Sequence, residues 1–216
     1  MSDISFLKQT KSVHVIGAGL NQERPAHKAF IDMKGRGYRM VPVHPRDAGS
    51  TIQGVPILPH PWASNDPELF VIFLSPERTL GLLRKWLIAN RNAPFIWLQP
   101  GAESDDVLEF LSEAEIPHSH GKCWVVTCIQ NDISCEDPLP QLPWVLQTSS
   151  TDGDLCSVWR YFPPGTDLEL DEPLEWVGDL MDLRSSDERI PRYVRSLCQD
   201  DESLAETARR LAIQPN

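Results

Sequence analysis

The chain has 216 residues, of which 41% are hydrophobic and 24% are charged. It is therefore long enough and apolar enough to fold around a core, and wholesale disorder is disfavoured. Its 20 Lys and Arg stand against 31 Asp and Glu, a net charge of −11, which disfavours a protein that holds a nucleic-acid backbone through its bulk field. We expect a globular protein that does not bind nucleic acid.

The charge is unevenly distributed along the chain. Residues 1–130 contain 13 basic and 13 acidic side chains, whereas residues 131–216 contain seven Arg, eighteen acidic residues, eight prolines and neither Lys nor His. We place a boundary near residues 131–138. This gives a first domain at 1–130 and an acidic accessory region at 131–216.

Apolar stretches and cysteines limit the class of protein further. No apolar run of signal-peptide length precedes the first expected strand, and no later stretch reaches 18 apolar residues, so we expect a cytoplasmic protein without a membrane segment. The five cysteines form no CxxC pair, and His118 and His120 supply half a metal site at best. Reduced thiols and no metal site are the expectation.

Residues 1–130 alternate short apolar runs with segments of helical spacing. Strands are expected at Val13–Ile16, Tyr38–Val43, Leu69–Leu74, Phe95–Leu98 and around Cys123–Thr127. Helices are expected at Pro25–Gly35, at Pro76–Ala89 with Leu80, Leu83, Leu87 and Ile88 on its apolar stripe, and from Ser104 through Glu113. Repeated strand–helix units predict an α/β fold, a Rossmann-like, doubly wound parallel sheet of about five strands. The loops at 17–27, 43–54, 74–79 and 99–103 should then meet at the carboxyl edge, where such sheets bind ligands.

The first of these loops suggests an anion site. Gly17-Ala18-Gly19 lacks the third glycine of a GxGxxG motif, so by itself it fits a tight strand-to-helix turn equally well. The continuation Asn21-Gln22-Glu23-Arg24-Pro25-Ala26-His27 adds a proline suited to the first helical turn, free backbone amides behind it, and an Arg beside them. These additions favour an anion over a plain turn.

The second loop bears on which nucleotide binds. NAD-binding sheets carry an acidic residue at the end of the second strand, but here that strand is followed by His44-Pro45-Arg46, with no carboxylate before Asp47. An Arg suits a ribose that carries a phosphate, as in CoA or NADP, better than plain NAD. The alternative is an Arg that is simply solvated in a loop.

The acidic region contains its own apolar segments. Leu142–Leu146 and Val158–Phe162 either pack onto the first domain or form short strands. Glu172–Leu183 has helical spacing, and Ser203 with Glu206 forms a capping box before a helix at Ala205–Ile213. We expect an acidic, mainly helical C-terminal extension with three short helices. It is either an accessory layer on the first domain or a docking module for a protein partner.

The first half of the chain also resembles a known family. From about Val13 to Cys123 it is similar to the small stand-alone bacterial CoA-binding proteins, whose domain is related to the N-terminal domain of the succinyl-CoA synthetase α-subunit. The family's motif residues that this chain keeps are Gly17, Asn21, Arg24, Pro25, Pro42, Val43, Pro45, Gly49, Ile52, Gly54, Trp97, Gln99 and Gly101. It departs from the family where Gly19 and Ala26 replace Ser and where His44 replaces Asn.

The resemblance implies a CoA or acyl-CoA site made of several loops. Its residues would be Gly17, Ala18, Gly19, Asn21, Arg24, Pro25, Ala26, His27, His44, Pro45, Arg46, Ile52, Leu74, Ser75, Pro76, Gln99 and Gly101. Members of the family are binders without an established reaction, so we expect a non-catalytic CoA-binding protein, with a ligand sensor or regulator as one form of it. Acyl-CoA ligase activity is not expected, because the second domain with its phosphorylated histidine is lacking. The alternative is an NADP-dependent oxidoreductase or redox sensor on the same fold.

Overall fold

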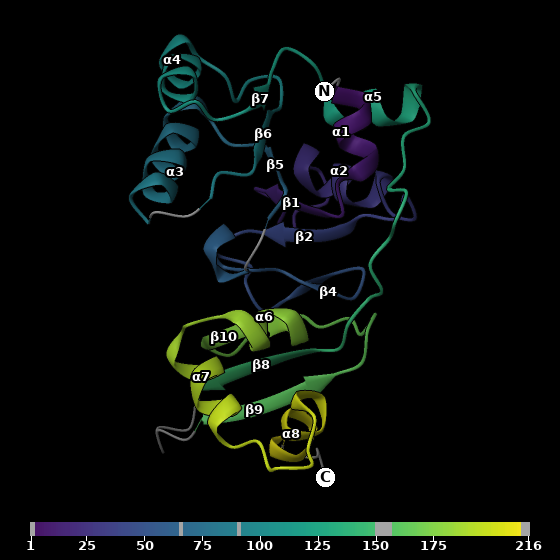
Figure 1. Cartoon of the computed structure of the whole chain (residues 1–216), viewed down its shortest axis with the longest axis vertical. Helices are drawn as coiled ribbons and strands as arrows, with labels where there is room; N and C mark the ends of the chain where they lie inside the picture. The colour runs from purple at the N-terminus through teal and green to yellow at the C-terminus, as the bar shows by residue number, and fades with distance from the viewer. Residues whose placement is uncertain (1–2, 65–66, 90–91, 150–156, 213–216) are drawn as a thin grey trace. The chain divides into compact units, whose positions relative to one another are not determined.

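The computed structural model describes residues 3–64, 67–89, 92–149 and 157–212 (Figure 1). The chain divides into two compact units, Met1–Val43 with Asp66–Pro140, and His44–Asn65 with Gln141–Asn216. The segment 44–65 therefore groups with the C-terminal region, although in sequence it lies inside residues 1–130. The division of the chain into 1–130 and 131–216 stays a prediction about domains.

The first unit is built on a five-stranded parallel sheet in the order β2-β1-β5-β6-β7. Its strands are β1 (Ser12–Ile16), β2 (Arg39–Val43), β5 (Leu69–Ile72), β6 (Phe95–Leu98) and β7 (His118–Ser119), and its helices are α1 (Asp3–Gln9), α2 (Pro25–Asp32), α3 (Pro76–Ile88), α4 (Asp105–Glu113) and α5 (Trp124–Gln130). Figure 1 shows α3 and α4 on one side of this sheet and α1, α2 and α5 on the other. The predicted α/β doubly wound fold is confirmed.

The two central strands form the core of this unit. Every residue of β1 and β5 is buried, as expected of strands covered by helices on both faces. The apolar stripe of α3 differs from the predicted one, because Thr79, Leu83 and Trp86 are its buried residues. The Trp86 ring stands edge-on against Phe70 of β5, with 4.9 Å between ring centroids, while Leu87 and Ile88 are exposed.

The prediction of a fifth strand at Cys123–Thr127 was wrong. That run is the helix α5, whose buried residues Trp124, Val125 and Cys128 follow helical spacing, and the fifth strand is the two-residue β7. A short apolar run rich in β-branched residues fits a strand or a buried helix equally well. The indole N–H of Trp97 donates to the Lys122 carbonyl at 2.9 Å, which ties the start of this helix to β6.

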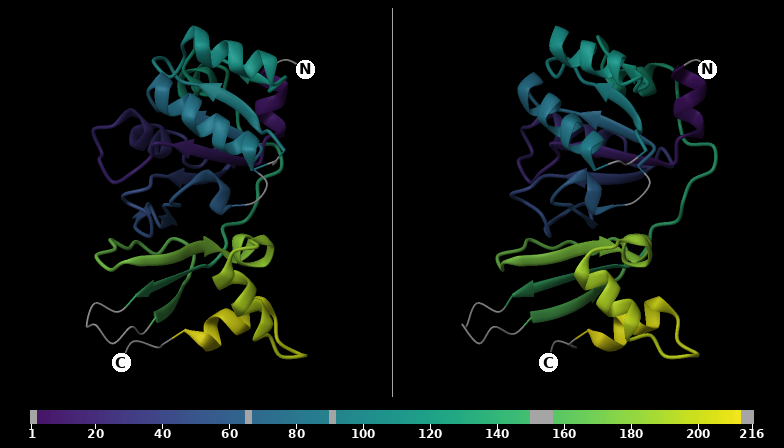
Figure 2. Two further views of the ribbon diagram at one scale, coloured as in Figure 1. Left: turned by 90° about the vertical axis from the view of Figure 1, so that its left-hand side faces the viewer. Right: turned by 60° about the vertical axis from the view of Figure 1, so that its left-hand side comes forward.

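The second unit contains a three-stranded antiparallel sheet in the order β10-β8-β9. Its elements are the hairpin β3 (Thr51–Ile52) and β4 (Val55–Pro56), a 3-10 helix at Pro61–Ala63, the strands β8 (Trp144–Ser149), β9 (Ser157–Phe162) and β10 (Leu174–Asp179), and the helices α6 (Leu180–Ser185), α7 (Arg189–Ser196) and α8 (Leu204–Leu211). The two apolar runs of the acidic region are thus strands. Figure 2 shows α7 and α8 against this sheet, where Val145, Trp159 and Trp176 pack with Leu183, Val194 and Ala208.

The predicted helix at Glu172–Leu183 is two elements. Leu174–Asp179 pairs with β8 as strand β10, and the helix begins only after Asp179, which caps it through a capping box with Asp182. The helical spacing of the apolar residues ran across this boundary by coincidence. The capping box of Ser203 and Glu206 is confirmed and starts α8, while Ile213, the predicted end of that helix, lies outside the described residues.

Candidate functional site

The carboxyl ends of four neighbouring strands, β2, β1, β5 and β6, are tied together by backbone hydrogen bonds. The amide of Gly17 donates to Val43 at 2.9 Å, that of Phe73 to Ile16 at 3.0 Å, and that of Gln99 to Ile72 at 3.1 Å. These bonds continue the sheet ladder past the strand ends, so the loops after β1, β5 and β6 begin at one edge. The strand order changes direction between β1 and β5, because β2 lies on one side of β1 and β5 on the other. Doubly wound sheets bind ligands at such a switch point.

The loop after β1 is held in shape by its own hydrogen bonds. Gly17 has a φ of +102°, and a Cβ there would lie 3.4 Å from the Phe73 carbonyl, so glycine lets the turn pass close to the end of β5. The Asn21 side chain accepts from the Glu23 amide at 3.0 Å. Nδ1 of His27 lies 2.7 Å from the Gly19 carbonyl and donates to it. The loop is therefore ordered before any ligand arrives.

Helix α2 begins at this loop with open amides. Pro25 occupies its first turn, Arg24 stands at the N-cap with extended backbone, and neither a side-chain cap nor an acidic residue is present in the first turn. The first intrahelical bond runs from the Lys28 amide to the Arg24 carbonyl, so the amides of Ala26 and His27 have no intrahelical acceptor. Together with the helix dipole and the exposed Arg24, they give this helix start a positive potential, of the kind that suits an anion.

The other two helices at this edge carry acidic groups where α2 has none. Glu77 lies in the first turn of α3, and its pKa is lowered by a hydrogen bond from its own backbone amide and by the Ser75 hydroxyl. In the loop before α4, the Glu103 carboxylate accepts from the amides of Gly101 and Ala102 at 2.9 and 3.1 Å. Sequence reasoning missed these two residues, although an acidic residue in a first helical turn is a readable signal.

Buried polar groups near the same edge lack partners. The side-chain nitrogen of Gln99, a residue only 3% exposed, and the hydroxyl of Thr79 make no hydrogen bond to the described residues. An unsatisfied buried polar group costs about 1–3 kcal/mol. Gln99 was predicted as a site residue from the resemblance, and its side-chain nitrogen is one of these buried donors.

The predicted site residues divide between the two units. The first unit holds, at one edge of its sheet, Gly17, Ala18, Gly19, Asn21, Arg24, Pro25, Ala26, His27, Leu74, Ser75, Pro76, Gln99 and Gly101. The second unit holds His44, Pro45, Arg46 and Ile52. There, Nδ1 of His44 lies 3.1 Å from the Asp47 carboxylate, and Pro45 and Arg46 are exposed between them.

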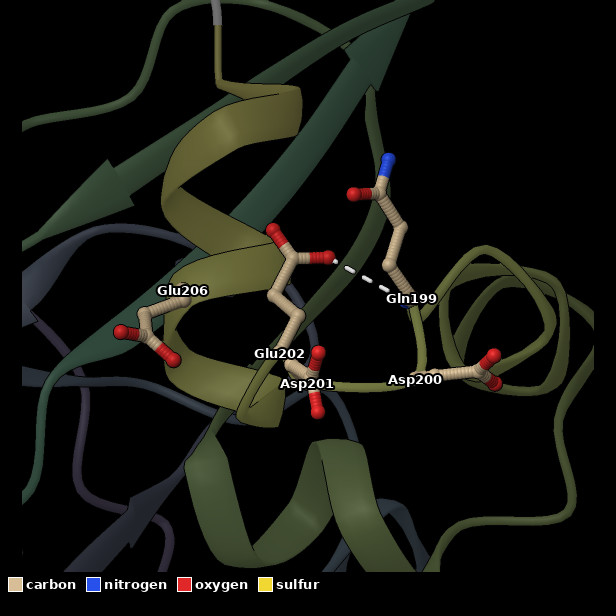
Figure 3. Close-up of a pocket in the computed structure, with 5 residues that line it drawn as sticks. All are labelled: Gln199, Asp200, Asp201, Glu202 and Glu206. Atoms are coloured by element: carbon tan, nitrogen blue, oxygen red, sulfur yellow. Dashed lines mark hydrogen bonds between the residues drawn. The ribbon is translucent and has the colours of Figure 1, made fainter.

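A hollow of about 480 Å³ in the second unit is lined mainly by acidic side chains, in contrast to the start of α2. It is lined by Gln199, Asp200, Asp201, Glu202 and Glu206, and Figure 3 shows Asp200 and Glu206 pointing in opposite directions. Glu202 accepts from Arg210 and Thr207, and the Arg210 guanidinium is the main cause that lowers the pKa of Glu202 to about 2. Glu202 and Glu206 hold the turn before α8, and the four carboxylates of the hollow would repel a phosphate.

The described residues contain no group of three or more His, Cys, Asp or Glu side chains placed to hold a metal ion. Burial raises the pKa of the Cys128 thiol to about 11, so this thiol stays protonated and unreactive at neutral pH. No helix among the described residues is both long and apolar enough to span a bilayer.

Known structures resemble a little more than half of the chain. A protein from Thermus thermophilus is 28% identical with a TM-score of 0.53, and its alignment covers 58% of this chain and 93% of that one. A hypothetical protein from Pyrococcus horikoshii OT3 is 20% identical with a TM-score of 0.52, and its alignment covers 59% and 89%. A conserved hypothetical protein from Pyrococcus furiosus is 26% identical with a TM-score of 0.48, over 55% and 98%. The remainder of this chain lies outside each alignment.

The search of curated proteins found no match. The family model described as CoA binding domain matches residues 11–128, which is more than half of the chain. These residues include the loop after β1, the open start of α2, and the second loop with Arg46. The chain therefore belongs to the CoA-binding domain family.

Proposed function

We propose that this chain is a non-catalytic protein that binds CoA or an acyl-CoA and senses or reports the presence of that ligand. The observation that carries the proposal is the open start of α2 at the switch point of the sheet, where two free amides and Arg24 meet. The diphosphate of CoA is an anion that suits such a helix start. Membership in the CoA-binding domain family supports the same ligand.

Ten of the predicted residues are assigned a part in this binding. Gly17, Ala18 and Gly19 keep the loop free of long side chains, and the amides of Ala26 and His27 with the Arg24 guanidinium hold the diphosphate. Gln99 offers its unpaired buried amide, and the half-buried Leu74 and Pro76 offer apolar surface. Arg46, exposed and without an ion pair to the described residues, binds the phosphate on the ribose, because a guanidinium fits phosphate as a two-pronged donor.

Several features favour binding without chemistry. The Nδ1–H of His27 donates to the Gly19 carbonyl, so this ring helps to hold the loop after β1 in shape. The Cys128 thiol is fully buried and protonated at neutral pH, so it does not serve as a nucleophile. A binder fits these side chains better than a ligase or an oxidoreductase.

NADP is the second candidate ligand, and one observation favours it. Arg46 at the end of the second strand suits a phosphorylated ribose in NADP as well as in CoA, and no carboxylate precedes Asp47 there. Both ligands also carry a diphosphate for α2. A direct comparison of the two ligands is therefore the deciding experiment.

The experiment measures the melting temperature of the full chain with CoA, acetyl-CoA, NADP and NAD at equal concentrations. A ligand that binds only the folded state stabilises it by about 2.7 kcal/mol at one hundred times its Kd. We expect CoA or acetyl-CoA to give the largest shift and NAD the smallest. A larger shift with NADP would favour the second candidate, and a shift with none of them would overturn the proposal.

A further inference from the structure

The hairpin β3–β4 of the second unit is held by an extended segment from the C-terminal region, Pro163–Leu170, which we call the strap. The Thr51 amide donates to the Leu168 carbonyl at 2.8 Å, and the Leu168 amide donates back to the Thr51 hydroxyl at 2.9 Å. The Leu170 amide donates to the Ser50 hydroxyl at 2.9 Å. The strap is thus held to Ser50 and Thr51 by three hydrogen bonds.

Asp167 of the strap fixes the tip of the hairpin. One carboxylate oxygen accepts from the Gly54 amide at 2.6 Å and from the Thr51 hydroxyl at 3.2 Å. Hydrogen bonds to a charged acceptor are stronger than those between neutral groups. Asp167 is therefore the main polar attachment of the strap to the turn between β3 and β4.

The strap also lies against bare glycine backbone. Gly54 has a φ of +75°, and a Cβ there would overlap the backbone of Gly165. A Cβ at Gly49 would overlap the side chain of Leu170. These two glycines belong to the motif that the chain shares with CoA-binding proteins, so the strap packs on a surface that this motif leaves free of side chains.

The loop that carries Arg46 is attached to the same hairpin at both ends. The His44 amide donates to the Leu58 carbonyl at 3.0 Å, and the Gly49 amide donates to the Ile57 carbonyl at 3.0 Å. The Ile57 amide in turn donates to Ser50 at 2.8 Å. Displacement of the hairpin would therefore displace the loop and the guanidinium on it.

We infer that the strap is a positioning element for Arg46, so that the C-terminal region sets the affinity for the phosphate on the ribose of the ligand. Asp167 is its principal positioning residue, acting through Thr51 and Gly54. The inference rests on the proposed function and adds to it a role for the C-terminal region in ligand specificity. Loss of the Asp167 carboxylate should loosen the hairpin and weaken contacts made by Arg46, while contacts made by the loop after β1 persist.

The test compares Asp167→Ala with Asp171→Ala in the full chain. Asp171 is exposed, lies just beyond the strap, and makes no hydrogen bond to the described residues, so its replacement removes the same charge without a contact. Affinities for CoA and for dephospho-CoA, which lacks the phosphate on the ribose, are measured by isothermal titration. We expect Asp167→Ala to weaken CoA binding about tenfold and dephospho-CoA binding about twofold or less, and Asp171→Ala to change neither.

A double-mutant cycle separates positioning from general destabilisation. In an Arg46→Ala background, Asp167→Ala should no longer change the affinity for CoA. Equal losses for the two ligands, or an unchanged loss in the Arg46→Ala background, would overturn the inference. If Asp167→Ala does not fold by circular dichroism, Ser50→Ala, which removes the acceptor of the Leu170 amide, decides by the same criteria. Wild-type chain that binds neither ligand would instead refute the proposed function itself.

Discussion

Helices α2 and α3 begin alike but differ in charge. Each follows a strand at the carboxyl edge, starts with a proline, and has an extended N-cap residue that makes no side-chain cap. The residue after the proline is Ala26 in α2 and Glu77 in α3. Glu77 accepts from its own backbone amide, whereas the first turn of α2 has neither an acidic side chain nor a side-chain cap. An anion site on such a sheet is thus specified as much by the missing carboxylate as by the glycines of the loop.

The strongest way to remove this difference is Arg24→Glu. The variant loses the guanidinium and places a carboxylate at the α2 amides, which makes α2 resemble α3. Because a charge-assisted hydrogen bond is worth about 1.5–3 kcal/mol and repulsion adds to its loss, we expect CoA binding to weaken about 100-fold or more. Isothermal titration measures this. Lys34→Glu, the same reversal beyond the C-terminal end of α2, is the control, and an equal loss there would contradict the assignment.

The second loop is expected to bind a different part of CoA from the part bound at α2. Arg46 should bind the phosphate on the ribose, whereas α2 should bind the diphosphate. We expect Arg46→Ala to weaken CoA binding roughly 10- to 150-fold, the loss of about 1.5–3 kcal/mol. Dephospho-CoA binding should change little, whereas Arg24→Glu should weaken both ligands. If titration gave equal losses for the two ligands with Arg46→Ala, that side chain would not be bound to the ribose phosphate.

The strands that lead to α2 and α3 differ as well, since β1 carries the buried His14 beside Phe70 of β5. Neither ring nitrogen of His14 has a partner among the described residues, and burial lowers its pKa from 6.5 to about 3. The His14 imidazole therefore binds a proton near pH 6.5 in the unfolded chain, whereas in the folded chain it stays neutral until about pH 3. Stability should fall as pH drops through this window, by about 2 kcal/mol at pH 5.

His14→Leu should remove this part of the pH dependence. Urea unfolding at pH 7 and pH 5 measures it, with the exposed His120→Gln as the control. We expect the difference in unfolding free energy between the two pH values to shrink by about 2 kcal/mol in His14→Leu and to persist in the control. An unchanged difference in His14→Leu would show that other groups cause the acid sensitivity.

The smallest expected effect comes from Glu103, which occupies the amides of Gly101 and Ala102. Glu103→Ala frees these amides and removes a negative charge from the edge, so CoA should bind about two- to fivefold more tightly, a gain of about 0.5–1 kcal/mol. Glu109→Ala, exposed on α4, is the control for charge alone. Weaker binding by Glu103→Ala would mean that the carboxylate organises the loop for the ligand.

Much of the first unit could be predicted because its strands are apolar runs bounded by glycine and proline. The sheet, the starts of α2 and α3, and the loop at Gly17 follow from these patterns. The run at Cys123–Thr127 could not be resolved, because its apolar residues suit a strand or a buried helix, and the two-residue β7 is too short to leave a periodic signal. The helical spacing across Glu172–Leu183 was overridden by pairing of β10 with β8 and by the cap at Asp179.

The candidate site could be predicted in part. Residues of the loop after β1 and Gln99 were recognised by motif, and they lie at one edge of the sheet. The association of 44–65 with the C-terminal region could not be predicted, because it depends on hydrogen bonds such as that of Thr51 with Asp167, which are 116 residues apart. No local pattern in either segment marks this partner.

This long separation has a consequence for synthesis on the ribosome. The hairpin emerges early, but Asp167 and Leu168, its hydrogen-bond partners, emerge more than a hundred residues later. At about 5–20 residues per second, translation leaves the hairpin unpaired for several seconds or more, with the Ser50 and Thr51 hydroxyls and two glycine surfaces exposed to water. Contacts of such long range also form slowly in a refolding chain. We therefore expect the second unit to fold last, and a nascent chain stalled before residue 163 to display this hairpin to chaperones and proteases.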